Sequence, residues 1–318
     1  MTYKTFIIDM FNLAYKKKSK IADPKQTANN VINFIEDEVK QRLEPNGKVY
    51  LTFDPLPKSD LGMEKNFKYG PERQKISRDY KSNRVHDEVI LAALRLLRKY
   101  YTYRGDEYPI VISNYLEADD YVEGIVNLEK DGMIAMVSTD MDWARYIDDR
   151  VHMINDSFDK PYTKQDFFES KGYFPTIAAI TLDKAIFGDK SDCIEPIMTK
   201  KNKIYKDSTD FIKALIKEIS KSDVTLKDVE KAIDYSQNVE LLGKMEKTHV
   251  EDIIALISIS SNALDALKNN IRLIKCRCDD VTKHIKCHAV NPSYNHLIEA
   301  TLERNKSNKQ KFHFGNIS

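Results

Sequence analysis

Carboxylates are the residues of this sequence with the clearest potential for chemistry. Glu117, Asp119 and Asp120 lie within four positions, and apolar residues at helical spacing follow them. This pattern predicts the first turn of an amphipathic helix, where acidic side chains also suit the positive end of the helix dipole. Further acids recur where strands or loops are expected to end: Asp9, Asp54, Asp140, Asp142, Asp189 and Asp192.

Together these acids favour a binding site for divalent cations. Each of them alone is explained as well by a turn or a helix cap. Carboxylates that lie close together raise one another's pKa, and they stay ionised only beside cations. Hard oxygen ligands suit Mg²⁺ or Mn²⁺, and such sites hydrolyse or transfer phosphate esters. The metal prediction therefore depends on the acids meeting in the folded chain.

The expected secondary structure explains how distant acids can meet. Short apolar runs predict strands at residues 3–8, 48–53, 109–113, 133–137 and 151–154. A helical pattern over residues 25–43 separates the first two strands. Alternating strands and helices, with an acid after most strands, predict a parallel sheet in a three-layer α/β core. Ligands of such sheets bind beyond the carboxyl ends of the strands.

The rest of the chain is expected to be mainly helical. Pro, Gly and Lys punctuate residues 56–70, which predicts a loop. Helical patterns follow at residues 71–101, with a break near Asn83, and again at residues 163–187 and 207–270. Few strand signals occur in these later segments, so a separate helical region is predicted.

Charge is balanced overall but uneven along the chain. The 318 residues include 50 Lys and Arg and 49 Asp and Glu. Residues 58–104, however, carry 12 Lys and Arg against 6 Asp and Glu, whereas residues 105–160 carry 4 against 14. A basic segment beside an acidic one is typical of a protein that holds a polyanion against bound cations.

The basic segment contains a candidate nucleic-acid contact. Arg78, Lys81 and Arg84 recur at the spacing of one helix face, and Tyr80 lies between them. An aromatic ring in such a setting can stack on a base. A solvated basic helix face explains the same residues equally well.

Location and cysteine use are less informative. No run approaches the roughly 18 apolar residues of a membrane span, and the N-terminus predicts a strand rather than a signal peptide. We therefore expect a cytoplasmic protein, in a host bacterium if the chain is phage-encoded. Cys276, Cys278 and Cys287 lie near His284, but their spacing is not that of a zinc site, which favours free thiols.

Five motifs resemble those of the flap endonuclease and 5′–3′ exonuclease family, and of its stand-alone phage members in particular. They are IIDMFNLAY at 7–15, RDYKSNR at 78–84, EADD at 117–120, STDMD at 138–142 and GDKSDCI at 188–194. They occur in family order and at family spacing, so the resemblance covers roughly residues 5–200.

The resemblance implies a domain organisation. Residues 1–188 would form a PIN/FEN-like nuclease core with a mostly parallel central sheet. Within it, residues 56–104 would form a helical arch through which a 5′ single strand passes. Residues 189–304 would form an all-helical DNA-binding region with a helix-turn-helix-like element for duplex, followed by a flexible tail at 305–318.

The resemblance also implies roles for the charged residues. Two Mg²⁺ ions, for which Mn²⁺ can substitute, would be bound by all nine acids, with Asp9 and Asp54 at the first ion. Lys81 and Arg84 would touch the scissile phosphate. Further DNA contacts are predicted for Tyr15, Lys16, Arg78, Tyr80, Lys200, Lys201 and Lys203.

The implied activity is metal-dependent hydrolysis of phosphodiesters near junctions of single strand and duplex. Expected substrates are DNA with a 5′ flap or an RNA primer, in replication or repair. A monomer is expected, and residues 310–314 are a candidate peptide for a sliding clamp or a single-strand-binding protein. Two departures from the family are Met10, where glycine is usual, and residues 193–198, which lack the glycine turn that often holds K⁺.

Two alternatives stay open. A PIN-type ribonuclease would share the sheet but have fewer acids and no arch. A non-catalytic protein that recognises branched DNA would keep the fold without cutting. Cleavage in the presence of divalent metal would exclude the non-catalytic protein. The preferred substrate, flap DNA or RNA, would separate the 5′ nuclease from the ribonuclease.

Overall fold

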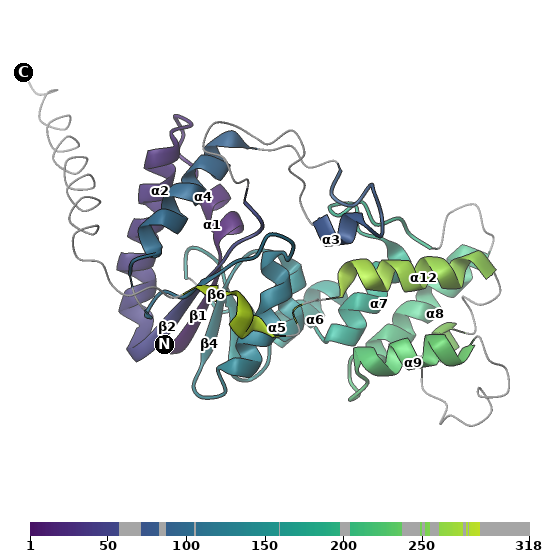
Figure 1. Cartoon of the computed structure of the whole chain (residues 1–318). Coiled ribbons are helices and arrows are strands. Elements are labelled where there is room, and N and C mark those ends of the chain that lie inside the picture. The colour runs from purple at the N-terminus through teal and green to yellow at the C-terminus, as the bar shows by residue number, and fades with distance from the viewer. Residues whose placement is uncertain are drawn as a thin grey trace, which may run out of the picture.

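The computed structural model of the chain is organised around a six-stranded sheet (Figure 1). It describes residues 1–56, 71–82, 87–104, 106–158, 160–197, 204–236, 249, 252–254, 261–275, 278 and 280–286. Across the sheet the strands are β5 (Val151–Ile154), β4 (Ile134–Val137), β1 (Tyr3–Asp9), β2 (Leu43–Thr52), β3 (Ile110–Val111) and β6 (Ile285–Lys286). No helix in the described ranges is long and apolar enough to cross a membrane.

Five of the strands are parallel, as the sequence predicted. β1 pairs with β2 and β4, and β3 and β5 extend the sheet on either side. β6 pairs antiparallel with β3, with Ile110 opposite Lys286. Because β6 belongs to the segment predicted to be all-helical, that part of the prediction is wrong. The chain returns to the sheet after its last described helix and covers the edge of β3.

Helices cover both faces of the sheet, which explains why its strands are apolar on both sides. One face carries α1 (Met10–Lys16), α2 (Pro24–Asn33) and α4 (Glu88–Tyr101). The other carries α5 (Ala118–Leu128) and the 3₁₀ helix η3 (Met141–Tyr146). Phe6 and Ile8 point to the first layer, whereas Ile7 and Tyr50 point to the second. This arrangement confirms the three-layer α/β fold (Figure 1).

The helix predicted over residues 25–43 is present but changes its hydrogen-bonding pattern. Asp23 caps α2 by accepting the N–H of Lys25 at 2.9 Å, and Pro24 occupies the first helical position. After α2 the chain continues as the π-helical turn η1 (Phe34–Val39) and the 3₁₀ turn η2 (Lys40–Arg42).

Helix α4 belongs to the packed core, although it falls within the segment predicted to form an arch. Asp87 caps it by accepting the N–H of Ile90 at 3.2 Å, and its apolar side chains, such as Leu94, are buried against α1 and α2. The other parts of the predicted arch, residues 57–70 and 83–86, lie outside the described residues.

Between α3 (Pro71–Gln74) and α4 the described chain forms turns through Ser82 rather than the helix predicted over residues 71–101. Arg78 and Lys81 therefore do not share a helix face. Lys81 has a φ of +52°, a conformation that costs free energy for a residue with a side chain. Its N–H donates to the carbonyl of Asp192 at 3.2 Å, so the neighbouring loop holds this turn in place.

The remaining helices form a second part of the molecule, on the right in Figure 1. They are α6 (Lys164–Lys171), α7 (Ile177–Phe187), α8 (Ile204–Ile219), α9 (Leu226–Ser236) and α12 (Ser261–Ile274). Helix α7 packs against α8, α9 and α12. The apolar core runs without a break from Tyr121 and Trp143 under the sheet to Leu182 and Leu267, across the domain boundary predicted at residue 188.

Candidate active site

Acids gather at the carboxyl edge of the sheet because the strands that precede them are parallel. Asp9 is the last residue of β1 and accepts the N–H of Asn12 at 2.9 Å. Asp54 follows β2 and accepts the N–H of Ala118 at 2.8 Å. Asp140 follows β4, where it caps η3 by accepting the N–H of Asp142 at 3.0 Å. The backbone therefore fixes one oxygen of each of these three carboxylates.

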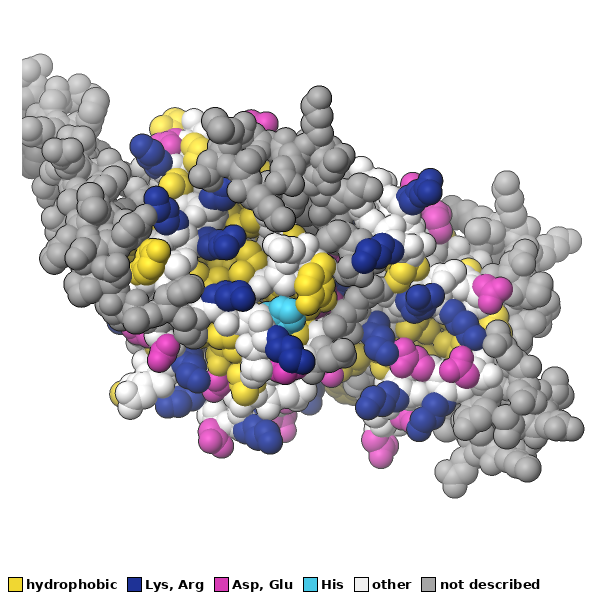
Figure 2. Space-filling view, in the orientation of Figure 1, with side chains coloured by type: hydrophobic (Ala, Val, Ile, Leu, Met, Phe, Trp, Pro, Cys, Tyr) yellow, Lys and Arg dark blue, Asp and Glu magenta, His cyan; other side chains and the backbone are white. Residues whose placement is uncertain are grey.

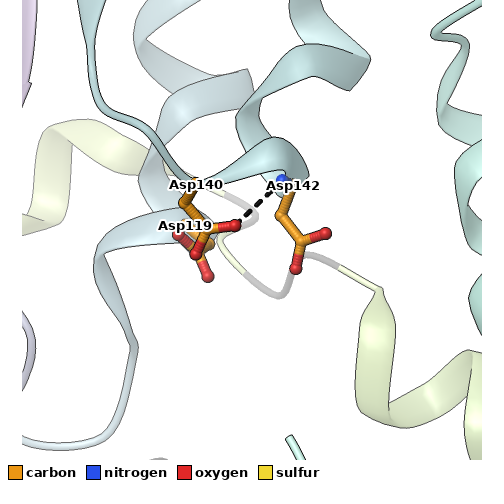
Figure 3. Close-up of side chains that lie close together, drawn as sticks. All are labelled: Asp119, Asp140 and Asp142. Atoms are coloured by element: carbon orange, nitrogen blue, oxygen red, sulfur yellow. Dashed lines mark hydrogen bonds between the residues drawn. The ribbon is translucent and has the colours of Figure 1, made fainter. Parts of the chain in front are cut away.

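Helix α5 contributes three further acids from its first turn. Glu117 and Asp120 form a capping box, in which the N–H of Glu117 donates to Asp120 Oδ2 at 2.9 Å. Asp119 accepts the indole N–H of Trp143 at 2.6 Å. Asp119, Asp140 and Asp142 each offer an oxygen within 4.8 Å of the others, and Figure 3 shows these three carboxylates facing one space.

The loop after α7 supplies the last two acids. Gly188 has a φ of +81°, and a Cβ there would lie 2.7 Å from the carbonyl oxygen of Ile194, so this tight turn needs glycine. The turn places Asp189 and Asp192 beside Asp142, with an oxygen of each within 4.8 Å of the others. All nine predicted acids thus contribute to one region at the sheet edge.

Three of these acids form no ion pair among the described residues. No Lys or Arg within the described ranges forms an ion pair with Asp9, Asp54 or Asp140. Burial raises the pKa of Asp9 well above its usual value, and the carboxylates of Asp119 and Asp54 raise it further. Burial raises the pKa of Asp54 to about 6, and burial and neighbouring carboxylates raise that of Asp140 to about 7. These groups repel one another and would ionise readily only beside a cation.

The other acids are paired with basic side chains. Arg73 forms ion pairs with Glu117 and Asp120, and Lys81 Nζ lies 2.5 Å from Glu117. Although burial alone would raise the pKa of Glu117, these cations lower it to about 2. Lys184 pairs with Asp142 and Asp189. Some acids of the cluster are therefore held in direct ion pairs, whereas Asp9, Asp54 and Asp140 form none with a described residue.

Arg73 and Arg145 are functional candidates that sequence reasoning missed. Arg73 Nε donates to the carbonyl of Leu273 at 2.7 Å, and Arg145 Nη1 donates to that of Ile274 at 3.3 Å. Both arginines therefore cap the C-terminal end of α12 while they pair with acids of the site. No sequence motif signals this link, because α12 lies about 200 residues beyond Arg73.

Replacing Arg73 by alanine should destabilise the protein by about 3–5 kcal/mol, because it leaves the buried carboxylate of Asp120 without its cation and removes one of the two cations beside Glu117. Chemical denaturation followed by circular dichroism measures this. Arg42→Ala is the matched control, since Arg42 pairs with Glu38 at 3.0 Å on the surface and should cost less than about 1 kcal/mol. Equal losses in the two variants would contradict this role of Arg73.

The predicted DNA-binding residues differ in how exposed the structure shows them to be. Tyr15 and Lys16 are exposed on α1, and Arg78 is exposed in the turn after α3, so contacts from them stay a prediction. Tyr80 is only 2% exposed and donates to Glu117 at 2.9 Å. The prediction that its ring stacks on a base is therefore wrong. Outside the described residues lie Arg84, Lys200, Lys201 and Lys203.

The donor set fits divalent cations. Every candidate ligand is a carboxylate oxygen, which suits Mg²⁺ or Mn²⁺. Asp9, Asp54, Asp119 and Asp140 could hold one ion, since Asp9 and Asp54 are buried and the pKa values of Asp9, Asp54 and Asp140 are all raised. Asp142, Asp189 and Asp192 could hold a second. These two sets are called the first and second acid groups below.

Comparison with known proteins identifies the fold. No family model and no curated protein matches the sequence. A crystal structure of the bacteriophage T5 D15 flap endonuclease, in a pseudo-enzyme-product complex with DNA and metal ions, matches with a TM-score of 0.53. The chain has the flap endonuclease fold. The match is 18% identical and covers 85% of this chain and 88% of the T5 chain.

A second structure supports the flap endonuclease fold. The T5 D15 protein co-crystallised with metal ions matches with a TM-score of 0.50 at 18% identity, again over 85% of this chain and 88% of that one. The resemblance drawn from five short motifs is therefore confirmed for the fold. At this level of identity the comparison leaves the activity to be argued from the acid cluster.

Proposed function

We propose that this chain is a divalent-metal-dependent 5′ nuclease that hydrolyses phosphodiesters near junctions of single strand and duplex. The observation that carries the proposal is the convergence of nine carboxylates, from five separate segments, on the carboxyl edge of a flap endonuclease fold. Buried acids without cations are costly to ionise, so their presence favours a bound metal.

Divalent cations in such a site lower the pKa of a bound water and neutralise charge on a phosphate, which is the chemistry of phosphodiester hydrolysis. The protein's own part is to hold the ligands. Asp9, Asp54 and Asp140 each have one oxygen fixed by a backbone N–H, and the second oxygen of Asp9 accepts the hydroxyl of Ser138 at 3.1 Å. This fixed arrangement means that little reorganisation is needed when substrate arrives.

Lys81 is proposed, with Arg84, to neutralise the scissile phosphate. In the structure the ammonium of Lys81 is held 2.5 Å from Glu117 and 3.9 Å from Asp192. It therefore already lies at the acid cluster, and its left-handed backbone conformation is fixed by the bond to the Asp192 carbonyl. A strained residue at a site of this kind is commonly part of its function.

We propose that exposed basic side chains contact DNA in two places, on α1 and on the helices of the second part of the molecule. Tyr15 and Lys16 project from the end of α1. On the second, helical part of the molecule, Lys227, Lys231 and Arg272 are exposed on α9 and α12, where Figure 2 shows Lys and Arg side chains interspersed with Asp and Glu. Such surfaces bind phosphates with little regard to sequence. We propose that the second one contacts duplex.

The test is cleavage of a 5′-labelled flap duplex with Mg²⁺, with Mn²⁺ and with excess EDTA. The proposal predicts a labelled fragment cut near the junction in both metals and no product in EDTA. A single-stranded RNA of the flap sequence is the matched control and should be cut far more slowly. Binding without cleavage in either metal would favour the non-catalytic branched-DNA protein, and preferred cleavage of the RNA would favour the ribonuclease.

A further inference from the structure

The second acid group already pairs with cations that belong to the chain. Arg145 lies 3.4 Å from Asp142 and Lys81 lies 3.9 Å from Asp192, but Lys184 makes the shortest contacts. Lys184 extends from α7, and its Nζ forms ion pairs with Asp142 Oδ1 and, at 2.6 Å, with Asp189 Oδ2. These acids form one group with Asp192, with ligand oxygens within 4.8 Å of one another. The ammonium of Lys184 therefore contacts two of the three acids that are suited to hold the second ion.

The first acid group differs in this respect. In the described part of the chain no Lys or Arg forms an ion pair with Asp9, Asp54 or Asp140, although all three are at the same sheet edge. Burial raises the pKa values of Asp54 and Asp140, and Lys81 and Lys184 lower them without forming ion pairs with these acids, whereas Lys184 is in direct ion pairs with Asp142 and Asp189. A cation entering the first group relieves repulsion, whereas one entering the second must compete with an existing ion pair.

We propose that Lys184 acts as an internal competitor for the second metal. Its ammonium holds the second acid group in the metal-free protein and must leave before a divalent cation binds there. The second group therefore binds metal more weakly than the first, and the first group is occupied at a lower metal concentration. This inference rests on the proposed function only in that divalent cations bind these acids.

The ammonium and a divalent cation cannot share these ligands. Both would lie within about 3 Å of the same oxygens, and at that separation like charges repel strongly in a partly buried site. The side chain of Lys184 has room to leave, since it is 21% exposed and borders a pocket lined also by Asp119, Asp192 and Tyr146. The backbone of α7 stays in place, because its neighbours Ala185 and Ile186 are fully buried.

Mn²⁺ titration of the full-length, DNA-free protein by calorimetry tests the proposal. The wild type should bind one ion more tightly than the other. Lys184→Met should tighten the weaker site by about tenfold or more, the scale of one charge-assisted hydrogen bond, and change the tighter site much less. Lys184→Arg, which keeps the cation, should bind the second ion as weakly as the wild type.

Lys221→Met is the matched control, because Lys221 pairs with Glu218 at 2.8 Å on the surface and should change neither site. A second-site affinity that is unchanged in Lys184→Met, while the first site still binds Mn²⁺, overturns the inference and leaves the proposed function standing. Absence of Mn²⁺ binding in every variant overturns both. Two equally tight sites in the wild type also overturn the inference.

A second measurement uses the wild type and avoids variants that fold poorly. Acetic anhydride labelling with mass spectrometry reports how available each lysine amine is. Mn²⁺ should raise the labelling of Lys184 severalfold, because the metal displaces it from Asp142 and Asp189, and should leave Lys221 unchanged. A Lys184 amine that becomes no more reactive at saturating Mn²⁺ contradicts the displacement.

Discussion

Replacing Asp140 by asparagine should reduce cleavage of a 5′-flap duplex by at least about 10³-fold while the protein still binds the DNA. Asparagine keeps a carbonyl oxygen that can accept the N–H of Asp142, so the cap of η3 survives. It lacks the negative charge that a metal ligand needs in the first acid group. Single-turnover cleavage and fluorescence anisotropy measure the two properties separately.

Asp280→Asn provides the matched control for this variant. Asp280 also caps a 3₁₀ helix, η4 (Val281–His284), and accepts the N–H of Thr282 at 3.1 Å, but it lies outside the acid cluster. Its replacement should leave cleavage within about twofold of wild type. Wild-type cleavage by Asp140→Asn, or a loss of cleavage that is fully explained by lost DNA binding, would contradict the role of Asp140.

The second prediction with a large expected effect is that Mg²⁺ stabilises the protein more strongly as the pH rises. In the metal-free protein the pKa of Asp54 is raised to about 6 and that of Asp140 to about 7. As the pH rises through about 4, the unfolded chain releases these protons while the folded chain keeps them, so the folded state loses stability between about pH 4 and pH 7. Mg²⁺ binds the ionised acids of the folded state and should reverse this loss.

Thermal unfolding in EDTA and in saturating Mg²⁺ checks this pH dependence. Mg²⁺ should raise Tm by about 3 °C or more at pH 8 and by less than about 1 °C at pH 5. Asp140→Asn should be more stable than wild type in EDTA at pH 8, by about 2 kcal/mol, because it removes one of the repelling charges. An equal Mg²⁺ shift at both pH values would show that the raised acids do not bind the metal.

Acids that are paired with basic side chains have the opposite pH dependence. The pKa values of Glu117 and Asp189 are lowered to about 2, because basic side chains outweigh the effect of burial. Their contribution is present above about pH 4 and is lost as the pH falls toward 2. The Mg²⁺ comparison is therefore made above pH 4, where these paired acids stay ionised and the raised acids Asp54 and Asp140 titrate.

The sheet and its acids could be predicted because both follow from local patterns. Apolar strands followed at once by an acid, as at Asp9 and Asp54, need only a parallel arrangement to bring those acids together. The capping box of Glu117 and Asp120 is likewise a short-range signal. Each of these features can be read within a few residues of the chain.

Features that depend on long-range contacts were not predictable from the sequence. Arg73 pairs with α5 and with the end of α12, and neither partner is near it in the chain. Tyr80 was expected on a helix between Arg78 and Lys81, but the chain turns there and buries the ring against Glu117. β6 is a two-residue strand, which is too short to show any alternation.

The most direct test of the central claim is to locate bound metal in crystals of the protein soaked with Mn²⁺. Anomalous scattering at the manganese edge should give a peak among Asp9, Asp54, Asp119 and Asp140, and a weaker one beside Asp142 and Asp189. Loss of the first peak in Asp140→Asn would tie it to the residue whose replacement stops cleavage. Crystals with no anomalous peak among these acids at saturating Mn²⁺ would contradict a metal-dependent nuclease.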